Sequence, residues 1–83
     1  DISWIVQVEG HTDNRPINTY LYPSNWELST ARATSVLKLL LQAGFKPDQL
    51  ASAGYGEYYP IALGDSEEDL RQNRRIELKL TSR

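Results

Sequence analysis

The sequence predicts an α/β fold, a two-layer sandwich in which helices cover one face of a mixed β-sheet. Three observations support this class: an alternating strand pattern opens the chain, a capped apolar helix follows, and a second alternating pattern closes the chain. With 83 residues and 40% hydrophobic side chains, the chain is expected to form a small core. Residues 1–83 are therefore predicted to be a single domain.

The first predicted elements are a strand, an ordered loop and a long helix. Apolar side chains recur at every second position over residues 2–8, the period of a strand, and Gly10 should end it. Residues 14–23 hold two prolines and show no periodicity, which predicts a loop. Ser24 and Glu27 have the spacing of a Ser-x-x-Glu capping box. A helix should therefore run over residues 24–44 and stop at a left-handed glycine.

The rest of the chain predicts a short strand at residues 50–53, a loop over residues 54–60, a short helix and a last strand. Acidic side chains at residues 65–69 precede arginines at residues 71–75, the charge order that a helix dipole favours. These acids are also expected to be solvated. Apolar and polar side chains then alternate over residues 76–81, which predicts the final strand.

Composition argues against several classes of function. Nine basic and eleven acidic side chains give a net charge of -2, which disfavours nucleic acid as a partner. With no cysteine and one histidine, the chain should form neither a disulfide framework nor a closed zinc site, and no cofactor is expected. No apolar run approaches the roughly 18 residues of a membrane span. Any membrane attachment is expected to come from segments outside this chain.

Asp13 and Arg32 are candidate binding residues because neither is needed to build a core. Asp13 follows the first strand, where its carboxylate either caps the turn or binds a ligand. Arg32 lies within the apolar stripe of the predicted helix. Its guanidinium either extends past the core, pairs with a structural carboxylate, or binds a ligand carboxylate through two parallel hydrogen bonds. Together the two side chains suggest a ligand that carries both charges.

His11 raises the question of catalysis or metal binding. Its imidazole is a candidate general base, a metal ligand, or a neutral group hydrogen-bonded within the turn, and we favour the last. A hydrolase would combine His11 and Asp13 with Ser24 or Ser29, but the chain has no Gly-x-Ser-x-Gly motif and Ser24 is explained as a cap. A metal site at His11 and Asp13 lacks a third ligand. We therefore predict neither catalytic nor metal-binding residues.

Two further groups of side chains have alternative roles. The tyrosines within residues 55–59 either line a binding cleft or cover the core with their hydroxyls in water, and we favour the second role. Arg74 and Arg75 straddle the junction between the last helix and the last strand. One of them should face solvent and the other the protein, where it would orient Asp13 or help to bind an anion.

The chain resembles the OmpA-like peptidoglycan-binding domain in four motifs that occur in the family's order. These motifs are Gly10-His11-Thr12-Asp13, Asn25-x-x-Leu28-Ser29-x-x-Arg32-Ala33, Gly54-Tyr55-Gly56-Glu57-x-x-Pro60 and Asn73-Arg74-Arg75-Ile76-Glu77. The long loop and helix start look most like the MotB branch, the wall-anchoring subunit of flagellar stators. The resemblance covers residues 6–80.

The chain departs from the family pattern in two places. The family domain opens with a further strand and a long helix, so this chain resembles the C-terminal two-thirds of the domain. Asp69 and Leu70 stand where the family usually has Gly-Arg, although Arg71 follows directly.

The resemblance implies non-catalytic binding of the diaminopimelate residue of the peptidoglycan stem peptide, which presents an ammonium and a carboxylate at one end. Matched position by position, Asp13 would take the ammonium and Arg32 the carboxylate, assisted by backbone donors at the helix start. The remaining site residues carried over from the motifs are Thr12, Asn25, Leu28, Ser29, Asn73 and Arg74.

The resemblance also implies a cell-wall anchor in the periplasm of a diderm bacterium, with the parent protein attached to the inner or outer membrane. Family members often pair, so a homodimer is a further expectation. Two rival functions remain open at this point: a peptidoglycan hydrolase that uses His11 and a serine, and a protein-interaction module that uses the surface of residues 55–59.

Overall fold

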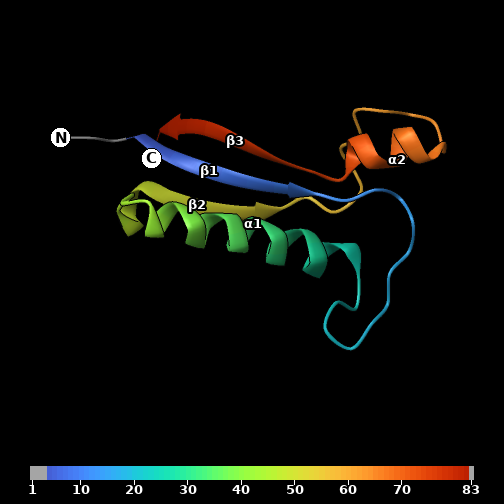
Figure 1. Ribbon diagram of the computed structural model, residues 1–83, viewed down its shortest axis with the longest axis horizontal. Coiled ribbons are helices and arrows are strands. Elements are labelled where there is room, and N and C mark those ends of the chain that lie inside the picture. Colours follow the sequence, from blue (N-terminus) through green and yellow to red (C-terminus); the bar gives the residue numbers. More distant parts are fainter. Residues whose placement is uncertain (1–3, 83) are drawn as a thin grey trace.

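The computed structural model describes residues 4–82, and its elements follow one another in the predicted order (Figure 1). They are β1 (Trp4–His11), α1 (Asn25–Gln42), a 3₁₀ turn (Pro47–Gln49), β2 (Leu50–Gly54), α2 (Glu67–Asn73) and β3 (Arg75–Ser82). Ile2 and Ser3, where the sequence places the start of the first strand, lie outside the described residues. The first strand continues to His11, one residue beyond its predicted end.

The strands form one mixed sheet in the order β2-β1-β3. Strand β1 pairs in parallel with β2, where Val8 lies opposite Ser52, and antiparallel with β3, where Val8 lies opposite Leu78. Helix α1 covers one face of the sheet, whereas α2 lies beyond the end of the strands (Figure 1). The predicted α/β class is confirmed, but only α1 forms the helical layer. With seven residues and Leu70 as its buried apolar side chain, α2 has little surface to place on a sheet.

Both ends of α1 follow from local chemistry. At its start, the Ser24 hydroxyl accepts a hydrogen bond from the Trp26 N–H at 3.2 Å and donates to the Glu27 carboxylate. At its end, Gly44 has φ 108°, and its N–H donates to the Leu41 carbonyl at 3.1 Å. A left-handed glycine that returns a hydrogen bond to the last turn is a common helix stop. The predicted cap at Ser24 and stop at Gly44 are therefore confirmed, and the helix between them spans Asn25–Gln42.

Small residues let α1 approach β1 closely. Val8 and Ala33 are fully buried between the two layers. A Cβ atom built on Gly10 would lie 2.2 Å from the backbone oxygen of Ser29, so no side chain fits there without separating strand and helix. This contact holds the start of α1 beside the end of β1. It thereby brings the predicted site residues of the two segments together.

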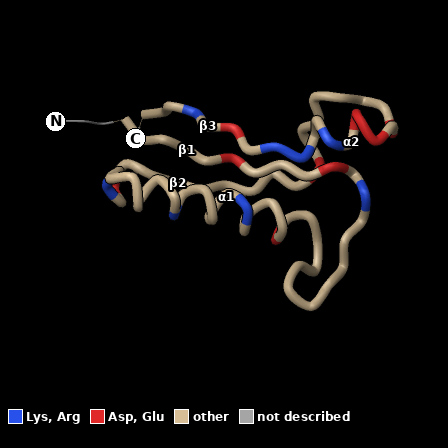
Figure 2. The backbone as a smooth tube through the Cα atoms, in the orientation of Figure 1, with Lys and Arg blue, Asp and Glu red and all other residues tan. Residues whose placement is uncertain are grey.

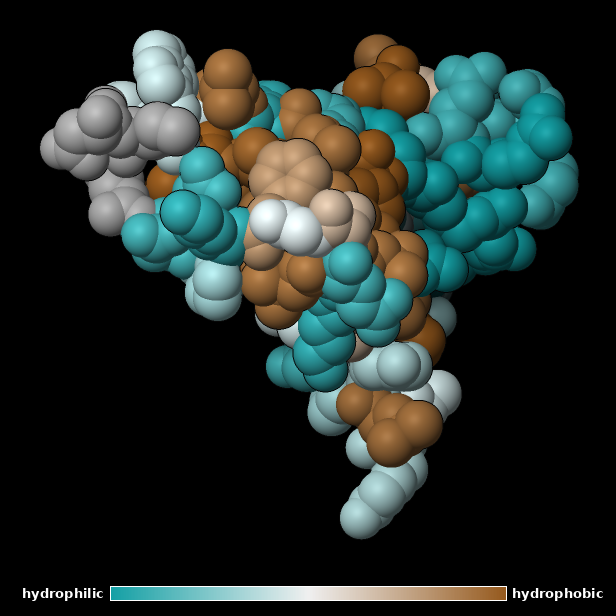
Figure 3. All heavy atoms as spheres, turned by 60° about the vertical axis from the view of Figure 1, so that its left-hand side comes forward, coloured by the Kyte–Doolittle hydropathy of each residue, from teal (hydrophilic) through white to brown (hydrophobic). Residues whose placement is uncertain are grey.

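Helix α1 leaves the apolar side of β3 uncovered. Leu78 and Leu80 on β3 are 57% and 68% exposed, and Leu39 of α1 is 61% exposed. Hydrophobic surface gathers on the face that Figure 3 displays. Within residues 4–82, neither helix has the length and apolar character needed to cross a bilayer.

Candidate functional site

A cavity of about 230 Å³ lies where β1 ends, next to the start of α1 and the start of β3. Most of the predicted site residues line it, namely Thr12, Asp13, Asn25, Leu28, Arg32 and Arg74. Charged residues are concentrated at this end of the sheet, near α2 (Figure 2). Asp13 and Arg32, which are 19 positions apart in the sequence, therefore share one cavity. This is the geometric condition for binding a ligand that carries both charges.

The carboxylate of Asp13 is buried, at 6% exposure, and is held by two arginines. Its Oδ1 accepts a hydrogen bond from the backbone N–H of Arg15 at 2.9 Å, and its Oδ2 accepts from Arg15 Nη2 at 2.9 Å and Arg74 Nη1 at 2.6 Å. Burial alone would raise the pKa of Asp13, but the hydrogen bonds from Arg15 and Arg74 outweigh it and lower the pKa. Asp13 is therefore an anion at neutral pH.

The lowered pKa of Asp13 predicts a specific acid sensitivity. Because the pKa lies below its ordinary value of 3.8 in the folded chain, ionised Asp13 stabilises the fold above that pH. The stabilisation is lost as the pH falls through the lowered pKa. Urea unfolding across a pH series should show the wild type losing stability more steeply below pH 3.8 than Asp13→Asn. If the free energy of unfolding has the same pH dependence in the two proteins, the lowered pKa of Asp13 is contradicted.

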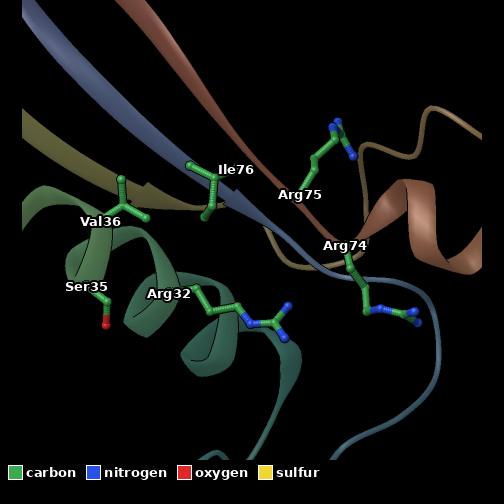
Figure 4. Close-up of a pocket in the computed structure, with 6 residues that line it drawn as sticks. All are labelled: Arg32, Ser35, Val36, Arg74, Arg75 and Ile76. Carbon is green, nitrogen blue, oxygen red and sulfur yellow. The ribbon is translucent and has the colours of Figure 1, made fainter. Parts of the chain in front are cut away.

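Arg32 differs from Asp13 because its guanidinium has no hydrogen-bond or ion-pair partner among residues 4–82. It extends from α1 toward the side of the sheet where Arg74 lies, whereas Arg75 points away (Figure 4). Arg32 is exposed, and both it and Arg74 also line a neighbouring cavity of about 460 Å³. The structural ion pair considered for Arg32 is thus not formed within the described residues, and the guanidinium is available to an anion.

Arg74 and Arg75 are both held by carboxylates, so the expectation that one of them faces solvent is wrong. The side chain of Arg74 is 26% exposed and bonds Asp13 and Glu67. That of Arg75 is 16% exposed and donates from Nε to Glu77 at 2.5 Å. Arg74 is the C-cap residue of α2 and Arg75 is the first residue of β3, and their side chains point in different directions (Figure 4). Arg74 is the one that orients Asp13.

Ser29 and Asn73, also predicted for the site, lie outside the lining of the cavity. Ser29 is fully buried, and its hydroxyl accepts from the Gly56 N–H at 3.0 Å and donates to the Trp26 carbonyl. The Asn73 side chain accepts from the Ile61 N–H at 2.8 Å. Both side chains fix the backbone of the segment between β2 and α2. Neither side chain is therefore placed to contact a ligand in this cavity.

Sequence reasoning missed three residues that complete the lining: Arg15, Pro16 and Ile17. A signal for Arg15 was present, because an Asp side chain in a turn commonly accepts from the N–H two residues later. Pro16 and Ile17 carry no comparable signal, since only the path of the loop brings them to the cavity. Asn25 helps to fix that path by donating to the Arg15 carbonyl at 3.1 Å.

His11 takes no part in this cavity. It is 4% exposed at the end of β1 and stacks on Tyr55 with ring centroids 5.2 Å apart. Neither ring nitrogen has a hydrogen-bond partner among the described residues, so the predicted bond within the turn is wrong. Burial, followed by the nearby Arg75 guanidinium, lowers the pKa of His11. Within residues 4–82, no serine hydroxyl is hydrogen-bonded to the imidazole, so the serine and histidine pair that a hydrolase would use is not formed there.

The tyrosines divide between two environments. The Tyr55 hydroxyl donates to Glu9 Oε2 at 3.1 Å, so the expectation that it lies in water is wrong. Tyr58 and Tyr59 are each 60% exposed, and Tyr58 stacks on Trp26 with centroids 5.2 Å apart. Tyr55 thus packs on His11, whereas Tyr58 and Tyr59 present an exposed aromatic surface.

Comparison with known proteins identifies the family of this chain. The sequence profile of the OmpA family matches residues 2–74. The peptidoglycan-associated lipoprotein of Pseudomonas aeruginosa is 42% identical over 74 residues, which are 89% of this chain and 42% of that protein. This chain spans less than half the length of the curated relatives that it matches.

Solved structures share the fold. The periplasmic domain of Helicobacter pylori MotB matches with a TM-score of 0.87 and 35% identity, over 99% of this chain and 51% of that one. The cell wall anchor of the T6SS from Pseudomonas aeruginosa matches with a TM-score of 0.83 and 41% identity, over 94% of this chain and 54% of that one. Because the family profile covers most of the sequence and the architecture agrees, the chain belongs to the OmpA family.

Proposed function

We propose that this domain binds peptidoglycan without covalent chemistry, through the diaminopimelate of the stem peptide, and anchors its parent protein to the cell wall. The observation that carries the proposal is the cavity shared by two side chains: Asp13, which is buried and ionised, and Arg32, which has no partner within residues 4–82. The family membership supports it, since one relative is named for its association with peptidoglycan and a solved neighbour is named a cell wall anchor.

The two charges of the ligand would meet different environments. The guanidinium of Arg32 offers a planar pair of donors to the carboxylate, which favours two parallel hydrogen bonds. Asp13 offers a rigid carboxylate to the ammonium, because Arg74 and the Arg15 N–H hold its orientation. Thr12, Asn25 and Leu28 would shape the walls around the aliphatic part of the ligand.

The proposed place of action is the periplasm, where diderm bacteria keep their peptidoglycan. The MotB domain of similar structure is periplasmic. Membrane attachment, to the inner or outer membrane, would come from other segments of the parent protein. Pairing of two copies stays a prediction. No bond is made or broken in this scheme, so the domain would act as an anchor and not as an enzyme.

Stem peptides of two compositions test the ligand. A soluble peptide that contains diaminopimelate should bind in isothermal titration calorimetry, and the same peptide with lysine should bind about 10- to 100-fold more weakly. Lysine keeps the ammonium but lacks the second carboxylate, and a hydrogen bond to a charged group contributes about 1.5–3 kcal/mol. Equal affinities would remove the proposed role of Arg32.

Arg15 should compete with the ligand. Its guanidinium lies 2.9 Å from Asp13 Oδ2, where the ligand ammonium would bind, and its side chain is 56% exposed. Because solvent screens the exposed guanidinium, we expect its pair with the buried carboxylate to contribute about 0–1 kcal/mol, so Arg15→Ala should raise affinity for the diaminopimelate peptide by up to about fivefold. The backbone N–H of Arg15 still orients Asp13 in this variant. A substantial loss of affinity would instead make Arg15 a ligand contact.

A further inference from the structure

Three potential metal ligands meet on the sheet face that points away from α1. Glu9 and His11 lie on β1, and Glu77 lies opposite Glu9 on β3. Gly10 contacts α1, and successive strand residues point to opposite faces, so its neighbours Glu9 and His11 point to the other side. One ligand atom from each of the three side chains lies within 4.8 Å of the other two. This spacing allows one ion to contact all three.

The imidazole of His11 gives independent evidence for a missing partner. It is 4% exposed, and neither ring nitrogen finds a hydrogen bond within residues 4–82, although Nε2 lies 3.9 Å from Glu77 Oε2. Buried polar groups in folded proteins are nearly always satisfied, so an exception calls for a cause. A metal ion would bond one nitrogen.

The surroundings hold the carboxylates in place. Glu9 Oε2 accepts hydrogen bonds from Tyr55 at 3.1 Å and from Gln7 at 2.8 Å, and Glu77 Oε2 accepts from Arg75 at 2.5 Å. Hydrogen bonds of this kind orient metal-binding carboxylates in known sites.

Space and charge also permit a bound ion. A cavity of about 380 Å³ adjoins the three ligands. Arg75 forms an ion pair with Glu77, and its fixed positive charge would oppose metal binding. Lys79 is the other cation, 3.5 Å from Glu9, but its side chain is 59% exposed and can move into solvent. Two carboxylates therefore face one fixed cation, which leaves net negative charge for an incoming ion.

We propose that Glu9, His11 and Glu77 form a binding site for Zn²⁺, with water completing the coordination. One imidazole nitrogen and two carboxylate oxygens are ligands that zinc accepts, and three protein ligands leave an open position. The ion would link β1 to β3 on the face opposite α1. The site is separate from the cavity of Asp13 and Arg32, so it does not depend on the proposed peptidoglycan binding.

Titration of the metal-free protein with ZnCl₂ tests the site. His11 is the only histidine, so every imidazole signal in a ¹⁵N NMR spectrum reports on it. We expect one ion per chain by calorimetry and a shift of the His11 ring signals. Glu77→Gln should weaken binding at least about tenfold, because loss of an orienting partner alone typically costs that much. Glu68→Gln is the matched control, because it removes an exposed carboxylate on α2, and this variant should bind zinc with the affinity of the wild type.

Two results would overturn the proposal: His11 ring signals that do not move in excess zinc, or equal affinities for the wild type and Glu77→Gln. Glu9→Gln provides a second ligand variant and should also weaken binding at least about tenfold. Since Glu9 is buried, circular dichroism should first establish that this variant folds. The side chain of Glu77 is 34% exposed, so its variant should disturb the fold less than Glu9→Gln does.

Discussion

Replacing Arg32 with glutamine should remove most of the binding to purified sacculi and leave the free energy of unfolding unchanged. The guanidinium has no partner within residues 4–82, so its loss should break no internal contact. A charged hydrogen bond to the ligand carboxylate is worth about 1.5–3 kcal/mol, which corresponds to about 10- to 100-fold in affinity. Sedimentation with sacculi measures the binding, and urea unfolding measures the stability.

Asp13→Asn should weaken binding over a similar range, since it removes the charge that would take the ammonium. Unlike Arg32→Gln, it should also destabilise the fold, because Arg74 loses its buried carboxylate partner. The double variant of Asp13 and Arg32 should show no retention above background. Lys38→Gln is the matched control, because Lys38 is an exposed base on the same helix and lies outside the cavity.

Equal retention of the wild type and the folded double variant would remove the proposed site. Retention that survives in the double variant but depends on the exposed tyrosines Tyr58 and Tyr59 would instead favour the interaction surface of residues 55–59. Release of soluble muropeptides that depends on His11 would favour the hydrolase. These results separate the three functions that the sequence leaves open.

Gly10→Ala should destabilise the domain by about 1–3 kcal/mol and weaken peptidoglycan binding together with stability. The added Cβ would lie 2.2 Å from the Ser29 carbonyl oxygen, which belongs to the backbone of α1 and cannot rotate away. Strand and helix must therefore separate. This movement would displace Arg32 from Asp13, because the two side chains belong to the segments that the contact joins.

Gly64→Ala is the matched control for that substitution. A Cβ at Gly64 would also have a neighbour at 2.2 Å, but the neighbour is the carboxylate end of the Asp69 side chain, which can rotate. Urea unfolding should therefore show a much smaller change for Gly64→Ala. If Gly10→Ala unfolds at the same urea concentration as the wild type, the close contact between β1 and α1 is not a constraint on the fold.

Much of the architecture was predictable because it depends on neighbouring residues. The Ser24 cap, the Gly44 stop and the strand β3 are read from a few consecutive positions, and the structure confirms each of them. The position of α2 was not predictable in this way. Its charge order predicts a helix but does not specify which surface the helix covers. In the structure, α2 lies beyond the end of the strands (Figure 1).

For the site, the sequence by itself determined which residue types were available: an acid after the first strand, a base within the first helix and a single histidine. Only the tertiary structure decided their partners. It joins Asp13 to Arg74 across 61 positions and sets Glu77 beside Glu9 and His11 through the register of β1 and β3. Among the residues that the structure describes, it gives Arg32 no partner. Local patterns specify a turn or a cap, whereas such pairings depend on how distant segments pack, which no single segment encodes.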